Sequence, residues 1–318
     1  MSVKKVLLNS GHRMPLLGLG CWQSPAGEVE AAVETALDAG YRHIDTAFVY
    51  LNEEAVGVGL HQWLNKTGNK RSEVFVVTKL PPHGMSAEGV HKFLQKSLKA
   101  LKLDYVDLYL VHLPVGLKSK HDLDILAKRD DGQFDIDEGT DLIAIWKEME
   151  KLVDMGLTKS IGVSNYSNKQ IRKTCAISKI KPAVNQVELH VYFQQRQMQE
   201  FCKTHNIFLT AYGPLGSPNR SNLTLPSPRL LEDPVVRLVA ERHGITTAQV
   251  LLRFLVQQNI IVIPKSVNPE RIKTNGDLWS FSLSELEMEA LTTLDKGESG
   301  RSFVFVGSGM TDHPEYPL

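Results

Sequence analysis

Eight short apolar segments, separated by helical patterns, constrain the fold of this chain most strongly. They are residues 14–20, 41–45, 74–79, 106–112, 159–165, 183–189, 207–212 and 260–266. Several are near-continuous rather than alternating, which is typical of parallel strands buried on both faces. Apolar residues recur at helical spacing between them, over 27–39, 52–64, 86–101, 141–155, 167–178, 194–205 and 246–257. Strands that alternate with helices indicate β–α–β units.

Eight such units in 318 residues predict a (β/α)8 TIM barrel, and we expect one domain over residues 1–318. The opening "VLLNSGHRMPLL" predicts an N-terminal β-hairpin. Two connections, 113–140 and 213–232, are too long for simple loops. Because they follow the fourth and seventh strands, they should lie at the carboxyl end of the barrel, where such enzymes build substrate pockets. The tail 295–318 either folds over this end as a C-terminal loop or is a disordered end.

Charge and cysteine content exclude several classes of protein. Lys plus Arg is 36 and Asp plus Glu is 36, so nothing favours a nucleic-acid or membrane partner. No apolar stretch approaches the roughly 18 residues of a membrane span. Cys21, Cys175 and Cys202 are far apart, which argues against a disulfide framework or a zinc site. We therefore expect a cytoplasmic protein that binds no metal.

Polar or aromatic side chains stand where the apolar segments end. They are Trp22, Asp45, Lys79, His112, Ser164, Asn165, Glu188, His190, Tyr212, Lys265 and Ser266. In a closed barrel these ends converge on one mouth. An isolated buried charge is costly unless it is paired, so Asp45 and Lys79 are the natural partners.

Tyr50 follows Asp45 by five residues and suggests proton transfer. A tyrosine with a pKa of about 10 is a poor acid at neutral pH, and the ammonium of Lys79 would lower that pKa. His112 could orient a substrate oxygen, so the four groups could protonate a carbonyl as a hydride arrives. Alone, Asp45 and Lys79 are as well explained by a structural ion pair, and His112 and Tyr50 by rim residues. Their arrangement at consecutive strand ends favours chemistry.

The chain resembles the aldo-keto reductase family over nearly its whole length. The matching stretches are "GLGCW" (18–22), "GYRHIDTAFVYLNEEAVGVGL" (40–60), "TKL" (78–80), "LDYVDLYLVHLP" (103–114), "IGVSNY" (161–166), "VNQVELH" (184–190), "AYGPLGS" (211–217) and "IPKSVNPERIKTN" (263–275). The resemblance implies a monomeric barrel that binds NADPH or NADP+ in extended form without a Rossmann domain. Consistently, "GLGCWQ" and "GVGLHQ" each lack the third glycine of a G-x-G-x-x-G motif.

The resemblance also assigns roles to particular residues. It implies that Tyr50 is the proton donor, that Lys79 and Asp45 tune it, and that His112 orients the carbonyl while hydride comes from nicotinamide C4. The implied cofactor-binding residues are Gly20, Cys21, Trp22, Asp45, Ser164, Asn165, Gln186, Tyr212, Gly213, Leu215, Ser217, Lys265, Ser266, Val267, Arg271 and Asn275.

Two cationic residues in this set bear on the choice of cofactor. Lys265 and Arg271 supply positive charge suited to the 2′-phosphate, which favours NADPH over NADH. Alone, "PKSVNPER" reads equally well as a strand followed by a solvated basic helix start. Thr274 stands where many family members carry a glutamate that contacts adenine, and Gly276 should soften its helix by up to about 1 kcal/mol.

We therefore expect an NADPH-dependent reductase that converts a small-molecule aldehyde or ketone to an alcohol. The alternatives are a ketosteroid-type reductase of bulky ketones and a non-enzymatic NADPH-binding relative. The expected substrate-binding residues are Trp22, Val49, Tyr50, His112, Leu113, Phe303 and Phe305. Phe303 and Phe305 either cap an apolar ligand or simply pack on the barrel. The substrate class stays open, because the pocket depends on how the long loops fold.

Overall fold

The computed structural model describes residues 4–125, 127–218, 229–304 and 308–317. Its strands are β1 (Lys5–Leu7), β2 (Arg13–Pro15), β3 (Leu19–Gly20), β4 (His43–Asp45), β5 (Phe75–Leu80), β6 (Val106–Val111), β7 (Thr158–Ser164), β8 (Val184–Glu188), β9 (Phe208–Tyr212) and β10 (Ile261–Val262). Strands β3 to β10 lie in sequence order in one parallel sheet. Bridges from Leu17 to Val262 and from Gly20 to Lys265 join its first and last strands. The predicted (β/α)8 fold is confirmed.

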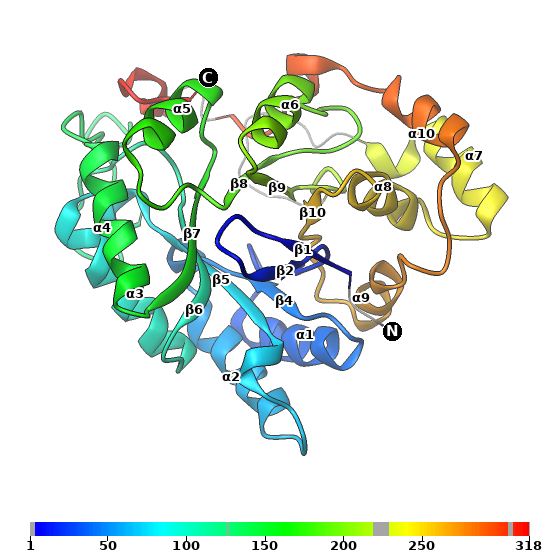
Figure 1. Ribbon diagram of the computed structural model, residues 1–318, viewed down its shortest axis with the longest axis horizontal. Helices are drawn as coiled ribbons and strands as arrows, with labels where there is room; N and C mark the ends of the chain where they lie inside the picture. The colour runs from blue at the N-terminus through cyan, green and yellow to red at the C-terminus, as the bar shows by residue number, and fades with distance from the viewer. Residues whose placement is uncertain (1–3, 126, 219–228, 305–307, 318) are drawn as a thin grey trace.

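Ten α-helices occur in the described part of the chain. They are α1 (Ala26–Asp38), α2 (Glu53–Leu64), α3 (Ala87–Leu101), α4 (Leu142–Asp154), α5 (Asn168–Ile177), α6 (Arg196–Thr204), α7 (Pro234–His243), α8 (Thr247–Val256), α9 (Pro269–Gly276) and α10 (Glu285–Thr292). In Figure 1, α1 and α2 lie below the sheet, α3 to α5 to its left, and α7, α8 and α10 to its right. The seven predicted helices lie within two residues of α1 to α6 and α8.

Helices α7 and α10 were not predicted, although both carry start signals. Asp233 accepts hydrogen bonds from the amides of Val235 and Val236, and Pro234 occupies the first helical position. Ser284 and Glu287 form a capping box at the start of α10. These signals precede segments with weaker apolar periodicity than the predicted helices.

The apolar segments are buried on both faces of the sheet. Every residue of β5 and β6 is buried, between the barrel interior and the surrounding helices. This is the environment that near-continuous apolar strands require. The polar residues that end these strands are therefore held on rigid elements.

The N-terminal hairpin covers the amino end of the barrel. Asn9 in its turn donates to the carbonyls of Pro182 and Asn206, which precede β8 and β9. Ser10 hydrogen-bonds to Ser160 near the start of β7. The hairpin crosses the centre of the barrel in Figure 1. The candidate site consequently lies at the opposite, carboxyl end.

The prediction of one strand over 14–20 is wrong. Strand β2 of the hairpin ends at Pro15, and barrel strand β3 begins at Leu19. Gly18 lies between them, where an added Cβ would come within 2.5 Å of the His43 ring. The chain therefore changes from the hairpin to the barrel at a residue that must lack a side chain.

The two long connections do follow the fourth and seventh barrel strands, as predicted. The first packs on the C-terminal tail: Met310 joins Val115, Leu117 and Phe134 in a small core of its own. The amide of Phe134 donates to the carbonyl of Ser308 over 2.8 Å. The first connection and the tail thus pack against each other. Residues 219–228 of the second connection and Phe305 of the tail lie outside the described residues.

No helix in the described part of the chain is both long enough and apolar enough to cross a membrane.

Candidate active site

A buried ion pair forms the base of the candidate site. Asp45 ends β4 and pairs in register with Val77, so Lys79 lies two residues further along β5 on the same face. The Lys79 Nζ is 2.6 Å from Asp45 Oδ1, and the two side chains are 0% and 2% exposed. The ammonium also donates to the carbonyl of Thr46 over 2.9 Å. Both charges are therefore held by the barrel wall.

Tyr50 and His112 adjoin this pair. Tyr50 ends a short 3-10 turn, η1 (Phe48–Tyr50), that follows β4, and Leu51 closes the turn with a φ of 55°. The Lys79 Nζ donates to the Tyr50 hydroxyl over 3.3 Å. The rings of Tyr50 and His112 meet edge to face with centroids 5.8 Å apart. The fold thus brings together the four residues that the sequence singled out.

The protonation of Tyr50 differs from the prediction. Burial raises the pKa of Tyr50 well above its ordinary value, and the negative charge of Asp45 raises it further. The expectation of a lowered pKa is wrong, because burial disfavours the phenolate and the negative charge of Asp45 adds to that effect. Tyr50 therefore carries its proton at neutral pH, as a proton donor must.

His112 is neutral in this environment. Burial lowers its pKa well below the ordinary value, and the charge of Lys79 adds to the effect. A neutral imidazole has one N–H donor and one acceptor nitrogen. His112 can therefore donate one hydrogen bond to a substrate oxygen without carrying charge.

A network of amides and hydroxyls continues from the ion pair. Gln186 in β8 donates to Asp45 Oδ2 over 2.7 Å. The side-chain Nδ2 of Asn165, a residue with a φ of 60°, donates to Ser164 Oγ over 3.0 Å. The Tyr212 hydroxyl donates to Asn165 Oδ1 over 2.8 Å. Four of the predicted cofactor residues are therefore linked to the acid–base group through hydrogen bonds.

Aromatic rings line one side of the mouth. The Phe303 ring lies 5.8 Å from Trp22 and 5.1 Å from Tyr212, measured between centroids. A Cβ added to Gly213 would lie 3.2 Å from the Phe303 ring and 3.4 Å from Ser217 Oγ. Phe303 thus packs on residues from two parts of the predicted site, after β3 and at the end of β9.

The predicted phosphate residues lie beside α9. Lys265 follows β10 and Arg271 lies in the first turn of α9; both side chains are exposed. Neither makes an ion pair within the described ranges. The Asn268 side chain caps the helix by accepting from the Arg271 amide. Two unneutralised cations at one helix start are suited to a phosphate.

The remaining predicted site residues differ in their burial and packing. Cys21 is fully buried and its amide donates to the carbonyl of Asp45. Leu215 and Val267 pack against the main core, and Leu113 packs against the small core of the first connection. Gly20, Ser266 and Asn275 are buried, and Val49 is half-buried.

The expected softening by Gly276 is wrong. Gly276 is the last residue of α9, so the interior penalty of glycine does not apply. An added Cβ would lie 3.0 Å from the Tyr41 ring. Close packing of α9 on Tyr41 therefore accounts for this glycine.

Glu188 is a site residue to which the sequence assigned no role. It ends β8, and its carboxylate accepts from the amides of Ser302 and Phe303. The position of Glu188 at the end of a strand marked it as a candidate site residue, but its partner Ser302 lies 114 residues further along the chain, in the tail. Sequence spacing could not pair the two.

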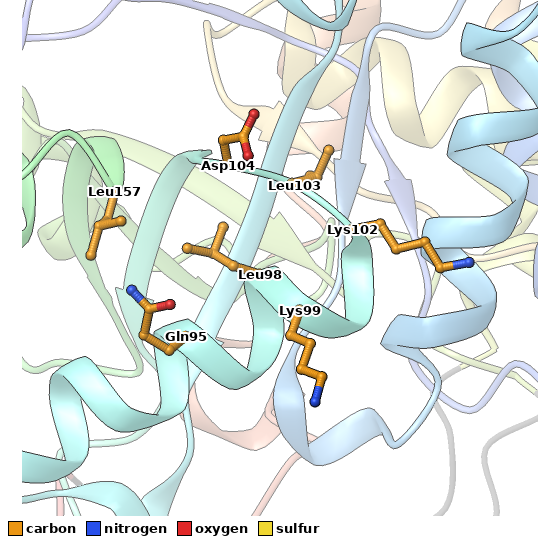
Figure 2. A pocket seen from close by; sticks show the side chains of 7 residues that line it. All are labelled: Gln95, Leu98, Lys99, Lys102, Leu103, Asp104 and Leu157. Carbon is orange, nitrogen blue, oxygen red and sulfur yellow. The ribbon is translucent and has the colours of Figure 1, made fainter.

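A hollow elsewhere on the surface does not belong to this site. Figure 2 shows it between the end of α3 and the segments that precede β6 and β7, at the amino end of the barrel. Its lining residues are Gln95, Leu98, Lys99, Lys102, Leu103, Asp104 and Leu157.

No group of three or more potential metal ligands occurs among the described residues.

Comparison with known proteins identifies the family and agrees with the fold. The model of the Aldo/keto reductase family matches residues 16–296. The chain is 44% identical over 298 residues to aldo-keto reductase family 1 member A1 of Xenopus tropicalis, covering 93% of this chain and 90% of that protein. It is 41% identical over 321 residues to dihydrodiol dehydrogenase 3 of Bos taurus, covering 99% and 97%. The solved aldose reductase from Schistosoma japonicum matches with a TM-score of 0.90 and 41% identity, covering 99% of this chain and 98% of that one.

Proposed function

This chain belongs to the aldo/keto reductase family, and on that premise we propose that it reduces an aldehyde or ketone to an alcohol with NADPH. Oxidoreduction of carbonyl groups is what the family membership supports. One observation carries the more specific proposal: the hydroxyl of Tyr50 accepts a hydrogen bond from Lys79, whose charge is fixed by buried Asp45.

Tyr50 is the proposed proton donor. Its raised pKa keeps the proton on the phenol until a substrate oxygen gains negative charge. Lys79 already directs an N–H at the phenol oxygen, so it stabilises the phenolate as the proton leaves. Asp45 and the carbonyl of Thr46 hold the ammonium in place, which limits reorganisation during the transfer.

His112 is the proposed orienting group. Its ring meets that of Tyr50 edge to face, so both side chains border the same space. Because the imidazole is neutral, its single N–H can donate to the carbonyl oxygen while Tyr50 donates the proton. Two donors directed at one oxygen fix the orientation of the carbonyl.

The residues present fit NADPH. The exposed cations of Lys265 and Arg271 lack acidic partners within the described ranges and would hold the 2′-phosphate. The amides of Asn165 and Gln186 would hold the carboxamide, and the Tyr212 ring would pack on the nicotinamide. When bound, NADPH would supply the hydride that reduces the carbonyl carbon.

The wall of the mouth favours an apolar carbonyl. Phe303 contacts both Trp22 and Tyr212 there. Val49 and Leu113 are half-buried aliphatic residues that adjoin Tyr50 and His112 in the chain. Apolar walls with a few polar groups at the reacting end are the usual form of a small-ligand pocket. We therefore favour aromatic or medium-chain aldehydes over sugar aldehydes.

A substrate panel tests the proposal. NADPH consumption is measured with benzaldehyde, propanal, a sugar aldehyde and a 3-ketosteroid, and NADPH binding is measured separately by fluorescence. We expect the largest kcat/KM for benzaldehyde. A steroid preference would instead indicate a bulky-ketone reductase. Cofactor binding without consumption of NADPH would indicate a non-enzymatic relative and contradict the proposal.

Two further parts of the proposal concern the oligomeric state and the cellular location of the protein. We propose that it acts as a cytoplasmic monomer. Light scattering of the purified full chain and fractionation of cells that express it test these two points.

A further inference from the structure

Glu188 is a buried carboxylate at the carboxyl end of the barrel. It is the last residue of β8 and only 1% exposed. Its oxygens accept from the Ser302 amide over 2.9 Å and from the Phe303 amide over 2.9 Å, and they also accept from the Ser302 hydroxyl. Three donors from two consecutive tail residues thus converge on one side chain.

These hydrogen bonds make Glu188 ionised despite its burial. Burial raises the pKa of Glu188, but the hydrogen bond and the charge of His190, together with hydrogen bonds from Ser302 and Phe303, outweigh burial and hold the pKa below its ordinary value. A buried charge is tolerated only when it is well paired or hydrogen-bonded. The tail donors therefore act together with His190 to hold this carboxylate.

The tail reaches Glu188 along a path that other contacts fix. The Lys296 amide donates to the carbonyl of Tyr192 over 2.8 Å. A Cβ on Gly300 would lie 2.0 Å from that same carbonyl, so the chain passes it closely. These contacts hold the tail before residue 301, and the Glu188 bonds then hold the backbone at Ser302 and Phe303.

The position of Phe303 matters because its ring is part of the mouth. It packs on Trp22 and on Tyr212, with centroid distances of 5.8 Å and 5.1 Å. Its backbone amide donates to Glu188 over 2.9 Å and lies two covalent bonds from the Cβ that carries the ring. A shift of that amide would move the ring relative to both partners.

We propose that Glu188 is a positioning residue that determines substrate specificity: it fixes the Phe303 ring as an apolar wall and so favours aromatic over small aliphatic carbonyls. This inference rests on the proposed carbonyl reduction for its substrate part. The attachment of the tail to Glu188 is independent of any activity and is measured separately.

Amide hydrogen exchange tests the attachment in the full chain. Glu188→Gln keeps the size of the side chain but replaces one acceptor oxygen with a donor. We expect exchange of the Ser302 and Phe303 amides to speed up by at least about tenfold. Ser302→Ala removes only the hydroxyl donor and should give a smaller increase.

Glu53→Gln is the matched control. Glu53 is also a buried carboxylate, 4% exposed, and it accepts from the hydroxyls of Thr78 and Ser97 on other parts of the barrel. It should leave exchange at Ser302 and Phe303 unchanged even if it lowers global stability. The same acceleration in Glu53→Gln would overturn the proposal, because the effect would then reflect general loosening.

Kinetics test the specificity. With NADPH, Glu188→Gln should raise KM for benzaldehyde about 3- to 10-fold, with little change in kcat and in KM for propanal. An equal change for both aldehydes, or none for either, would overturn the proposal. Turnover by the unmodified protein is checked first. Its absence contradicts the proposed function, whereas normal turnover with an unchanged Glu188→Gln variant contradicts the role of Glu188.

Discussion

The ammonium of Lys79 lies 2.6 Å from the carboxylate of Asp45, and both side chains are withdrawn from solvent. Desolvation offsets much of the attraction within such a pair, so stability alone is a weak reason for it. The pair instead fixes a positive charge beside the Tyr50 hydroxyl, 3.3 Å from the ammonium. Its geometry is what the proposed proton transfer requires.

Removing one member of this pair should be costly. Asp45→Asn leaves the Lys79 ammonium buried without a counter-charge, and we expect a loss of about 3–5 kcal/mol in the free energy of unfolding. Urea denaturation measures it. Glu270→Gln is the control, because Glu270 and Lys273 form a pair that is 80% and 58% exposed. A similar loss in both variants would show that burial of the first pair has no special importance.

The predicted phosphate site can be tested with two cofactors. Lys265→Met should weaken NADPH binding by roughly tenfold and leave NADH binding unchanged, because only NADPH carries the 2′-phosphate. Fluorescence titration at fixed salt gives both dissociation constants. Lys273→Met, in α9 and paired with Glu270, is the control and should change neither. Equal weakening of both cofactors by Lys265→Met would place the lysine elsewhere on the ligand.

The sequence predicted the barrel and the Asp45, Lys79, Tyr50 and His112 group well for a physical reason. Parallel strands that are buried on both faces have continuous apolar sequences, and polar residues at their ends stand out against them. The order of the strands then brings these ends together without further information. The four side chains therefore became neighbours through topology alone.

Two kinds of feature could not be predicted from the sequence. The contact between Glu188 and the Ser302 amide joins residues 114 positions apart, and backbone donors leave no mark in the sequence. The pKa of Tyr50 depends on burial and on the nearby charge of Asp45, which only the packed site reveals. Gly18 was likewise included in a strand because its contact with His43 is tertiary.

Buried His43 should make stability depend on pH. Burial lowers the pKa of His43 to about 4, whereas an unfolded histidine titrates near 6.5. The unfolded chain thus binds the proton first as pH falls. The contribution is fully present above about pH 6.5 and is lost towards about pH 4, at up to about 1.4 kcal/mol per pH unit. His43→Leu should therefore show a shallower decline in unfolding free energy over this range, and identical slopes would contradict the assignment.

Gly59 should tolerate no side chain. An added Cβ would lie 2.4 Å from the carbonyl of Glu30, so α2 and α1 would have to separate. We expect Gly59→Ala to lower the free energy of unfolding by about 1–3 kcal/mol. Gly27, in the first turn of α1, has open space around it, so Gly27→Ala should be neutral or gain up to about 1 kcal/mol. Thermal denaturation measures the change in stability of both variants. It shows whether the contact between α1 and α2 or the conformational entropy of glycine determines that change.

Single-turnover reduction of benzaldehyde by the Tyr50→Phe variant tests the central claim most directly. Phenylalanine keeps the ring beside His112, so NADPH binding should remain near normal. It removes only the hydroxyl, which is the proposed proton donor. Because general acid catalysis contributes typically 10²- to 10⁴-fold, we predict that the rate of NADPH oxidation falls by at least about 100-fold. A rate equal to that of the unmodified protein, with NADPH bound, would contradict the account.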